Sequence, residues 1–229
     1  MIHILMPTRN KPEEIIRVCR ELSDAECRLW IYVADDDPKL TEYQALILPT
    51  GATAVYGIPL GFSRGVNHLA SLASQQPGAT MLMRAEDDFY FKSGWDAKYR
   101  AAMWPDGLGM VWCNYVLKGP EAEPHTAAIG IAWYKALGWF SLPGVQHHYC
   151  DNVLREMAER IGRIRYIPEP MIEHRHNRKD PRKCGHGKLI YDLDKKRYYQ
   201  WQRDEKEDDC QRLCIDDQDA ASGLSKRAI

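Results

Sequence analysis

Residues 79–88, which read ATMLMRAEDD, organise the rest of the chain. An apolar run of this length, preceded by Pro77-Gly78 and followed by charge, predicts a buried β-strand. Ligands of open α/β sheets bind beyond the carboxyl ends of the strands, so the acids that follow are expected at the rim of such a crevice. Neighbouring carboxylates repel one another unless a cation joins them. A divalent metal therefore competes here with a simple solvated turn as the explanation of Glu86, Asp87 and Asp88.

The composition limits the classes of protein to which the chain can belong. Its 229 residues are 45% hydrophobic, enough for one large α/β domain or two small ones. The formal net charge of −1 argues against a protein that is basic all over, although a local basic patch stays compatible with it. We expect no membrane span and no signal peptide, because long apolar runs and a basic leader are lacking. The seven cysteines, an odd number, favour free thiols and a cytoplasmic location.

The N-terminal part predicts a β–α–β unit. Residues 2–6 form a short apolar run and residues 28–34 form a second one. Between them, Asn10 is expected to cap a helix in which Pro12 lies in the first turn. This order implies a right-handed crossover between parallel strands.

The remaining pattern continues the alternation of strands and helices. Strands are expected at 54–57, 109–116, 125–133, 163–167 and 171–176, and helices at 61–73, 96–103, 134–140 and from Asp151 onward. The fold class is therefore α/β, with a mixed, mostly parallel sheet flanked by helices. The second strand also ends in a run of acids, at 35–37, so that two acidic runs are expected at one edge of the sheet.

The composition changes towards the C-terminus. Residues 174–188 are rich in Lys and Arg, and residues 204–219 are mostly acidic. We therefore predict one domain over 1–180 and a C-terminal lid or appendage over 181–229 that ends in a loose tail. Residues 177–200 are expected to be mobile without the donor and to order over it, next to the bound diphosphate.

The order of these motifs resembles a GT-A glycosyltransferase, most closely glycosyltransferase family 2. The resemblance covers about residues 2–176 and rests on the segments 7–10, 35–37, 61–67, 86–88 and 138–140, on Asp151, and on a late strand ending in His174. It implies an inverting transferase that takes a sugar from a nucleoside diphosphate sugar, most simply a UDP-sugar, with Mn²⁺ or Mg²⁺ as its cofactor.

The resemblance also implies roles for individual residues. The metal would be held by Asp88 and by His174 or His176, and Asp151 would be the catalytic base, although Cys150-Asp151 stands where the family usually has Glu-Asp. The donor would be bound by Pro7, Thr8, Arg9, Asp35, Asp36, Arg64, Asn67, Glu86 and Asp87. The acceptor would contact Trp95, Asp96 and Trp139.

Each of these residues also has a simpler structural explanation. Asp151 and Asp96 are good helix-capping residues, and the histidines could be ordinary exposed residues at a strand end. Trp95 and Trp139 are as well suited to core packing as to stacking on a sugar. A carboxylate in reach of a hydroxyl would nevertheless be the proton acceptor that such a transfer needs.

The acceptor and a second class of function stay open. The dense cations of 175–188 would suit a hydroxymethylated base in DNA as the acceptor. Alternatively, His174, His176, Cys184 and His186 have side chains that bind zinc, so the chain could be a nucleic-acid-binding module without transfer chemistry. Exchangeable Mn²⁺ or Mg²⁺ would favour the enzyme, and tightly bound Zn²⁺ the binding module.

Overall fold

The computed structural model of the chain describes residues 1–115, 122–175 and 187–214. Its strands are β1 (Ile2–Thr8), β2 (Cys27–Ala34), β3 (Thr53–Gly57), β4 (Met81–Arg84), β5 (Phe89–Phe91), β6 (Met110–Cys113), β7 (Ala128–Gly130), β8 (Ile164–Ile167) and β9 (Ile172–His174). Its helices are α1 (Pro12–Glu21), α2 (Leu40–Ile47), the 3₁₀-helix η1 (Leu48–Thr50), α3 (Phe62–Ala73), α4 (Trp95–Ala102), α5 (Ile131–Leu137), α6 (Cys150–Arg160) and α7 (Lys188–Asp204). None of these helices combines the length and the apolar character that crossing a membrane requires.

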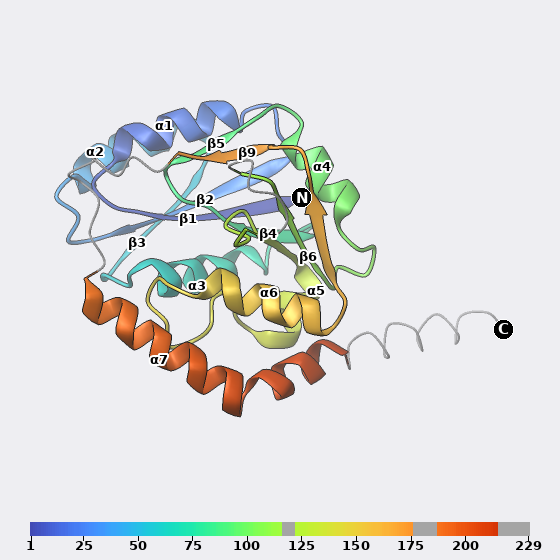
Figure 1. Cartoon of the computed structure of the whole chain (residues 1–229). Helices are drawn as coiled ribbons and strands as arrows, with labels where there is room; N and C mark the ends of the chain where they lie inside the picture. The colour runs from blue at the N-terminus through green and yellow to red at the C-terminus, as the bar shows by residue number, and fades with distance from the viewer. Residues whose placement is uncertain (116–121, 176–186, 215–229) are drawn as a thin grey trace.

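A seven-stranded sheet forms the centre of the molecule, with the strand order β3-β2-β1-β4-β7-β6-β8 (Figure 1). Strands β1 to β4 pair in parallel, and β6 pairs in parallel with β8. Strand β7 runs antiparallel to both of its neighbours, β4 and β6. The predicted fold class, a mixed and mostly parallel sheet flanked by helices, is confirmed.

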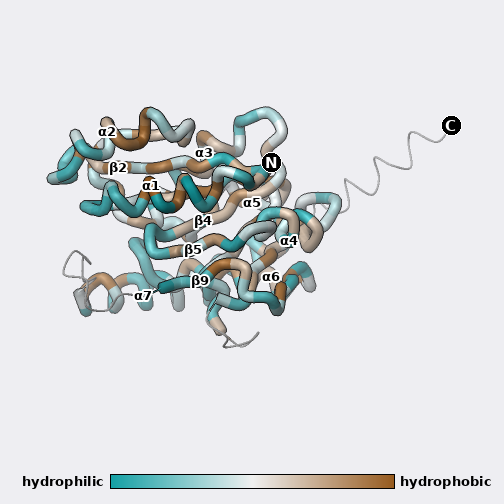
Figure 2. The backbone as a smooth tube through the Cα atoms, turned by 90° about the horizontal axis from the view of Figure 1, so that it is seen from above, coloured by the Kyte–Doolittle hydropathy of each residue, from teal (hydrophilic) through white to brown (hydrophobic). Residues whose placement is uncertain are grey.

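Helices cover both faces of this sheet, and each face has its own hydrophobic core (Figure 1). Successive side chains of a strand point to opposite faces, so Leu5 enters one core while Ile4 and Met6 enter the other. Helices α1, α2 and α4 pack on the side of Ile4, and α3, α5, α6 and α7 on the side of Leu5. Seen from above, α1 shows hydrophobic and hydrophilic residues in alternation, as expected for a helix that buries one side (Figure 2).

A second, two-stranded sheet places the residues of the candidate site. Strands β5 and β9 pair antiparallel, with Phe89 opposite His174 and Phe91 opposite Ile172. They lie beside α1 and α4, on the same face of the large sheet (Figures 1 and 2). Because β5 follows the acids at 86–88 directly, this pairing brings a histidine from near the end of the domain to those acids.

The structure corrects two local predictions. Asn10 does not cap α1: the N-cap is Lys11, and Asn10 adopts a positive φ of 60° while its backbone N–H donates to Asp37. The strand predicted over 125–133 is limited to Ala128–Gly130. At Gly130 the chain passes so close to Gly107 that a Cβ atom would lie 2.0 Å from the carbonyl oxygen, and there it turns into α5.

The described part of the C-terminal region, 187–214, is packed on the first-domain core. Helix α7 buries Trp201 completely and Tyr198 almost completely in the core below the sheet. Leu213, beyond the end of α7, belongs to the same core. Of the lid predicted over 177–200, residues 177–186 lie outside the described residues, and nearly all of the rest belongs to α7. The predicted loose tail also lies outside the described residues.

Candidate active site

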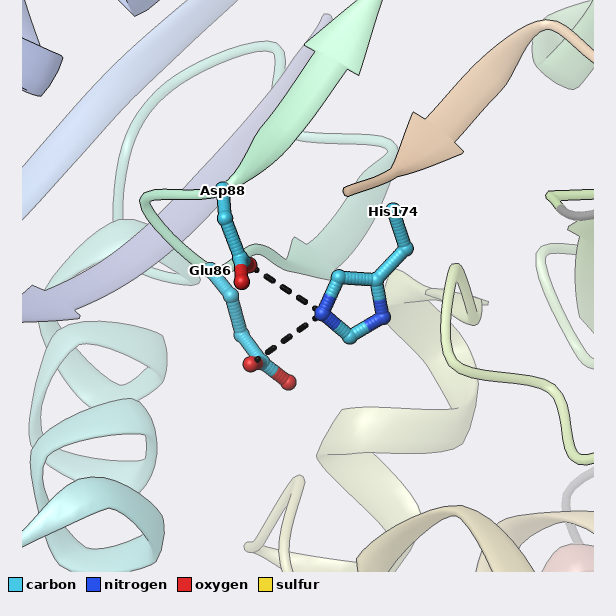
Figure 3. Close-up of side chains that lie close together, drawn as sticks. All are labelled: Glu86, Asp88 and His174. Atoms are coloured by element: carbon cyan, nitrogen blue, oxygen red, sulfur yellow. Dashed lines mark ion pairs between the residues drawn. The ribbon is translucent and has the colours of Figure 1, made fainter. Parts of the chain in front are cut away.

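Three side chains that can bind a metal converge where β4 ends. Glu86 and Asp88 come from the turn between β4 and β5, and His174 is the last residue of β9 (Figure 3). The Nε2 atom of His174 lies 3.1 Å from an Asp88 carboxylate oxygen and 3.5 Å from a Glu86 oxygen. The candidate ligand atoms of the three residues all lie within 4.8 Å of one another.

Asp87 points away from this cluster. Its carboxylate accepts hydrogen bonds from Lys11 Nζ, at 2.7 Å, and from Thr8 Oγ1, at 3.2 Å. Burial raises the pKa of Asp87, and Lys11 opposes that effect by favouring the ionised carboxylate. The acidic run thus makes two sets of contacts: Glu86 and Asp88 contact His174, and Asp87 contacts Thr8, at the end of β1, and Lys11.

Arg17 of α1 fixes the backbone of the acidic turn. Its guanidinium donates to the carbonyl oxygens of Asp87 and Phe89 and lies over the ring of Tyr90, 3.8 Å from its centroid. From the opposite strand, the backbone N–H of Arg175 donates to the carbonyl of Asp88 at 3.1 Å. Asp88 is therefore held from both sides before any ligand binds.

The protonation states of Glu86 and His174 depend on each other and on the charges beside them. Burial disfavours the ionised form of Glu86, but His174 and Arg84 outweigh it and hold the pKa of that carboxyl well below its usual range. Burial likewise opposes protonation of His174, whereas the Asp88 and Glu86 carboxylates raise its pKa to about 9. A proton on the imidazole thus occupies the electrostatic position that a cation would take between these carboxylates.

The chemistry of this donor set fits the predicted cofactor. Two carboxylates suit Mg²⁺ and Mn²⁺, and the imidazole nitrogen favours the transition metal of the two. His174 and Asp88 are both among the predicted ligands, whereas His176, the third, lies outside the described residues. Glu86, predicted to bind the donor, lies in the cluster itself.

Asp151 is the second residue of α6. Its carboxylate is 2.7 Å from Nδ1 of His125 and 3.3 Å from the guanidinium of Arg84. Burial opposes ionisation, but Arg84 and His125 hold the pKa of Asp151 well below its usual range. Asp151 does not cap α6, because the N-cap is Tyr149 and no side chain makes a capping hydrogen bond there.

Sequence reasoning missed both partners of Asp151. Arg84 stands inside the apolar run that forms β4 and is only 3% exposed. A buried arginine almost always has an acidic partner, so its position in the run was a usable signal. His125 gave no such signal, because the fold alone brings it beside a residue 26 positions later in the chain.

A cavity of about 340 Å³ is lined by Glu86 and His174 of this cluster, by Asp151 and by Tyr191 of α7. Its walls combine ionisable groups from β4, β9 and α6 with aromatic rings from the loop before α6 and from α7 itself. The lining residues are Arg84, Glu86, Glu123, His125, His147, His148, Tyr149, Asp151, Asn152, His174 and Tyr191.

The residues predicted to bind the nucleoside gather at the ends of β1 and β2. Arg9 forms an ion pair with Asp36 at 2.6 Å, and Thr8 shares a hydrogen bond with the hydroxyl of Tyr43 at 3.1 Å. Asp35 is exposed at the same edge. Pro7 packs so closely against α3 that a Cβ atom on Gly65 would lie 3.0 Å from its ring.

Five other predicted residues do not line the cavity. The side chain of Asn67 stabilises the loop after α5. It accepts hydrogen bonds from the backbone N–H groups of Phe140 and Ser141 and donates one to the carbonyl of Ser141. Arg64 is exposed on α3, and Trp139 is part of the core below the sheet.

Trp95 and Asp96 are also reassigned to structural roles. Trp95 is 1% exposed and packs between the rings of Phe91 and Tyr99, so it presents no surface to an acceptor. Asp96 accepts from Arg100, at 2.7 Å, and from the backbone of Glu26. In place of these residues, the aromatic walls of the cavity come from Tyr149 and Tyr191, which the sequence analysis did not select.

No family model and no curated protein matches the chain. Solved structures do match, and among them are structures of TarS from S. aureus. TarS 1–349 in complex with UDP-GlcNAc has a TM-score of 0.63 and 12% identity, over 93% of this chain and 70% of that one. TarS 1–349 with UDP has a TM-score of 0.58 and 11% identity over 75% of this chain, and a longer TarS structure has 0.59 and 10% over 76%.

The chain spans 59% of the length of TarS 1–349 in the UDP complex and 36% of the longer TarS chain. At these identities the likeness concerns the arrangement of helices and strands and does not single out family 2. The chain therefore shares with S. aureus TarS a fold of helices on both faces of a mixed, mostly parallel sheet.

Proposed function

We propose that the chain is a metal-dependent glycosyltransferase that moves a sugar from a UDP-sugar to an acceptor hydroxyl with inversion. The observation that carries the proposal is the cavity at the carboxyl end of β4, which is lined by Glu86 and His174 of the candidate metal-binding cluster and by an ionised Asp151. The fold supports it, because the structures with this fold include complexes with UDP and with UDP-GlcNAc. Membership of family 2 is part of this proposal.

Asp88, His174 and Glu86 would hold Mn²⁺ or Mg²⁺. Bound there, the cation would act as a Lewis acid for the negative charge that develops on the departing diphosphate. The chain's own residues prepare this position, because Arg17 and the β5–β9 pairing fix Asp88 and His174 in advance. The donor's nucleoside would lie at the ends of β1 and β2, near Thr8, Arg9 and Asp36.

Asp151 would receive the proton of the attacking hydroxyl. Its low pKa keeps it ionised throughout the neutral range, which a proton acceptor requires, and it lowers the affinity of the carboxylate for that proton. Arg84 and His125 orient it through their direct contacts. Attack from the side opposite the diphosphate inverts the anomeric carbon in a single displacement.

We also propose that residues 1–180 form the catalytic domain and residues 181–229 an appendage to it. A cytoplasmic location completes the proposal, and it fits the free thiols of the six cysteines in the described residues.

The experiment that tests the proposal has two parts. Isothermal titration calorimetry with UDP, in Mn²⁺ and then in excess chelator, measures whether nucleotide binding needs metal. A panel of UDP-sugars is then incubated with protein and Mn²⁺, and released UDP is measured. We expect metal-dependent binding and turnover of at least one donor. Equal UDP affinity in chelator would contradict metal dependence, and tight Zn²⁺ without UDP binding would favour a binding module.

A further inference from the structure

One wall of the cavity is an aromatic array that comes from the loop before α6 and from α7. The hydroxyl of Tyr149 donates to that of Tyr191 at 2.9 Å, and the Tyr191 ring meets His148 edge to face at 5.3 Å. Below them, Tyr149 stacks on Tyr198, with centroids 4.7 Å apart and an interplanar angle of 18°. The wall thus presents flat rings to the cavity from two segments that are 42 residues apart.

Asp194 of α7 holds this wall in place. It is fully buried, and its carboxylate accepts the three successive backbone N–H groups of Gln146, His147 and His148 at 2.8–2.9 Å. Consecutive N–H groups converging on one anion form a rigid nest. The next residue, Tyr149, has a positive φ of 65°, which a non-glycine residue adopts only when its surroundings enforce it. The wall is therefore preorganised.

We propose that the wall of His148, Tyr149 and Tyr191 is the acceptor subsite and that it binds a saccharide ring. This inference rests on the proposed function. Aromatic side chains with a few convergent polar groups are typical of small-molecule sites, and a sugar ring matches both, with a flat face of C–H groups and hydroxyls at its edge. Asn152 and Asp151, which line the same cavity, supply hydrogen-bond partners for such hydroxyls.

The charges of the cavity favour a neutral ring over a nucleic acid. Its lining contains three carboxylates, Glu86, Glu123 and Asp151, against one arginine, Arg84, and His174, whose pKa the neighbouring carboxylates raise to about 9. Nucleic-acid binding depends on Lys and Arg contacts to phosphates, and carboxylates repel those phosphates. The hydroxymethylated base of DNA is therefore the less favoured acceptor for this subsite.

The test compares two tyrosines of α7. Tyr191 lines the cavity and is 42% exposed, so Tyr191→Ala should not disturb folding. Tyr199, 53% exposed on the same helix, does not line the cavity, so Tyr199→Ala is the matched control. Tyr191→Phe removes only the hydroxyl. A panel of methyl glycosides serves as the probe, in saturation-transfer NMR and as acceptors with the donor found above.

We expect the wild type and Tyr199→Ala to bind at least one methyl glycoside equally. Tyr191→Ala should raise the KM for it about tenfold, the scale of one lost aromatic contact, and Tyr191→Phe should stay near the wild type. Metal-dependent UDP affinity should not change, because the nucleoside is proposed to bind at the ends of β1 and β2. This second readout separates the subsite from the proposed function, because a wrong function would fail there in every variant.

Three results would overturn the proposal. They are the absence of methyl glycoside binding to the wild type, equal effects of Tyr191→Ala and Tyr199→Ala, and selective binding of 5-hydroxymethyl nucleosides or oligonucleotides in place of the glycosides. The NMR measurement needs no donor, so it tests saccharide binding at this wall separately from UDP binding.

Discussion

The ion pair between Arg84 and Asp151 should make Asp151→Asn costly to stability as well as to transfer. From the sequence, the same substitution looks harmless to the fold, because Asn caps helices as well as Asp does. In the structure, Asp151 caps nothing, and its carboxylate faces an arginine whose side chain is 3% exposed. Neutralising Asp151 leaves that buried charge without its main compensation.

The magnitude follows from the burial of the pair. Removing one partner of a buried ion pair costs about 3–5 kcal/mol. The amide oxygen of the introduced asparagine would still accept from Arg84 if it kept the present separation of 3.3 Å, so we expect the lower end, about 3 kcal/mol. The double variant Arg84→Met/Asp151→Asn removes both charges, so its loss should be smaller than the sum of the single losses by about 1–3 kcal/mol.

Urea unfolding of the wild type, both single variants and the double variant measures these differences, without nucleotide and metal. The exposed pair Arg160–Glu207, at 3.0 Å with side-chain exposures of 57% and 59%, is the matched control. Glu207→Gln should cost no more than about 1 kcal/mol. A loss below about 0.5 kcal/mol for Asp151→Asn, or strictly additive losses in the cycle, would show that Arg84 does not depend on Asp151.

Three further predictions concern the metal cluster and the sheet. Asp88→Ala should weaken Mn²⁺ binding, measured by calorimetry, at least tenfold, and an unchanged affinity would remove Asp88 from the ligand set. Arg17→Ala should weaken Mn²⁺ binding about 10- to 100-fold, although Arg17 is not one of the proposed ligands, because Arg17 fixes the backbone of the acidic turn. Arg20 is exposed on the same helix, so Arg20→Ala should leave the Mn²⁺ affinity unchanged. Equal affinities of the two variants would show that the acidic turn keeps its conformation without Arg17. Burial lowers the pKa of His3, which accepts from Trp30 Nε1, to about 4, so the folded state keeps it neutral. The stability that neutral His3 contributes to the folded state is complete above about pH 6.5 and is lost as the pH falls towards about 4, by on the order of 3 kcal/mol. Urea unfolding at about pH 7.5 and 4.5 should therefore show a smaller decrease in the free energy of unfolding for His3→Gln than for the wild type.

Local pattern alone predicted most of the fold. The apolar runs that became β1, β2 and β4 are long enough, and bounded clearly enough, to be recognised one at a time. The acids after β4 could be placed at a sheet edge for the same reason. Strand β5 and helix α2 escaped notice, because a three-residue strand carries too little periodicity and α2 lacks a capping signal.

Local sequence was sufficient for the α/β architecture, because each apolar run can be recognised on its own. The candidate roles of Asp88, His174 and Asp151 came from the resemblance that the order of these elements carries. Which side chains meet depends on the tertiary structure. The pairing of β5 with β9 brings His174 to Asp88, and the packing of α7 carries Tyr191 to the cavity through Asp194. Such contacts depend on packing between segments distant along the chain. No local pattern of residues encodes these contacts, although they bring the acids after β4 together with the other residues of the candidate site.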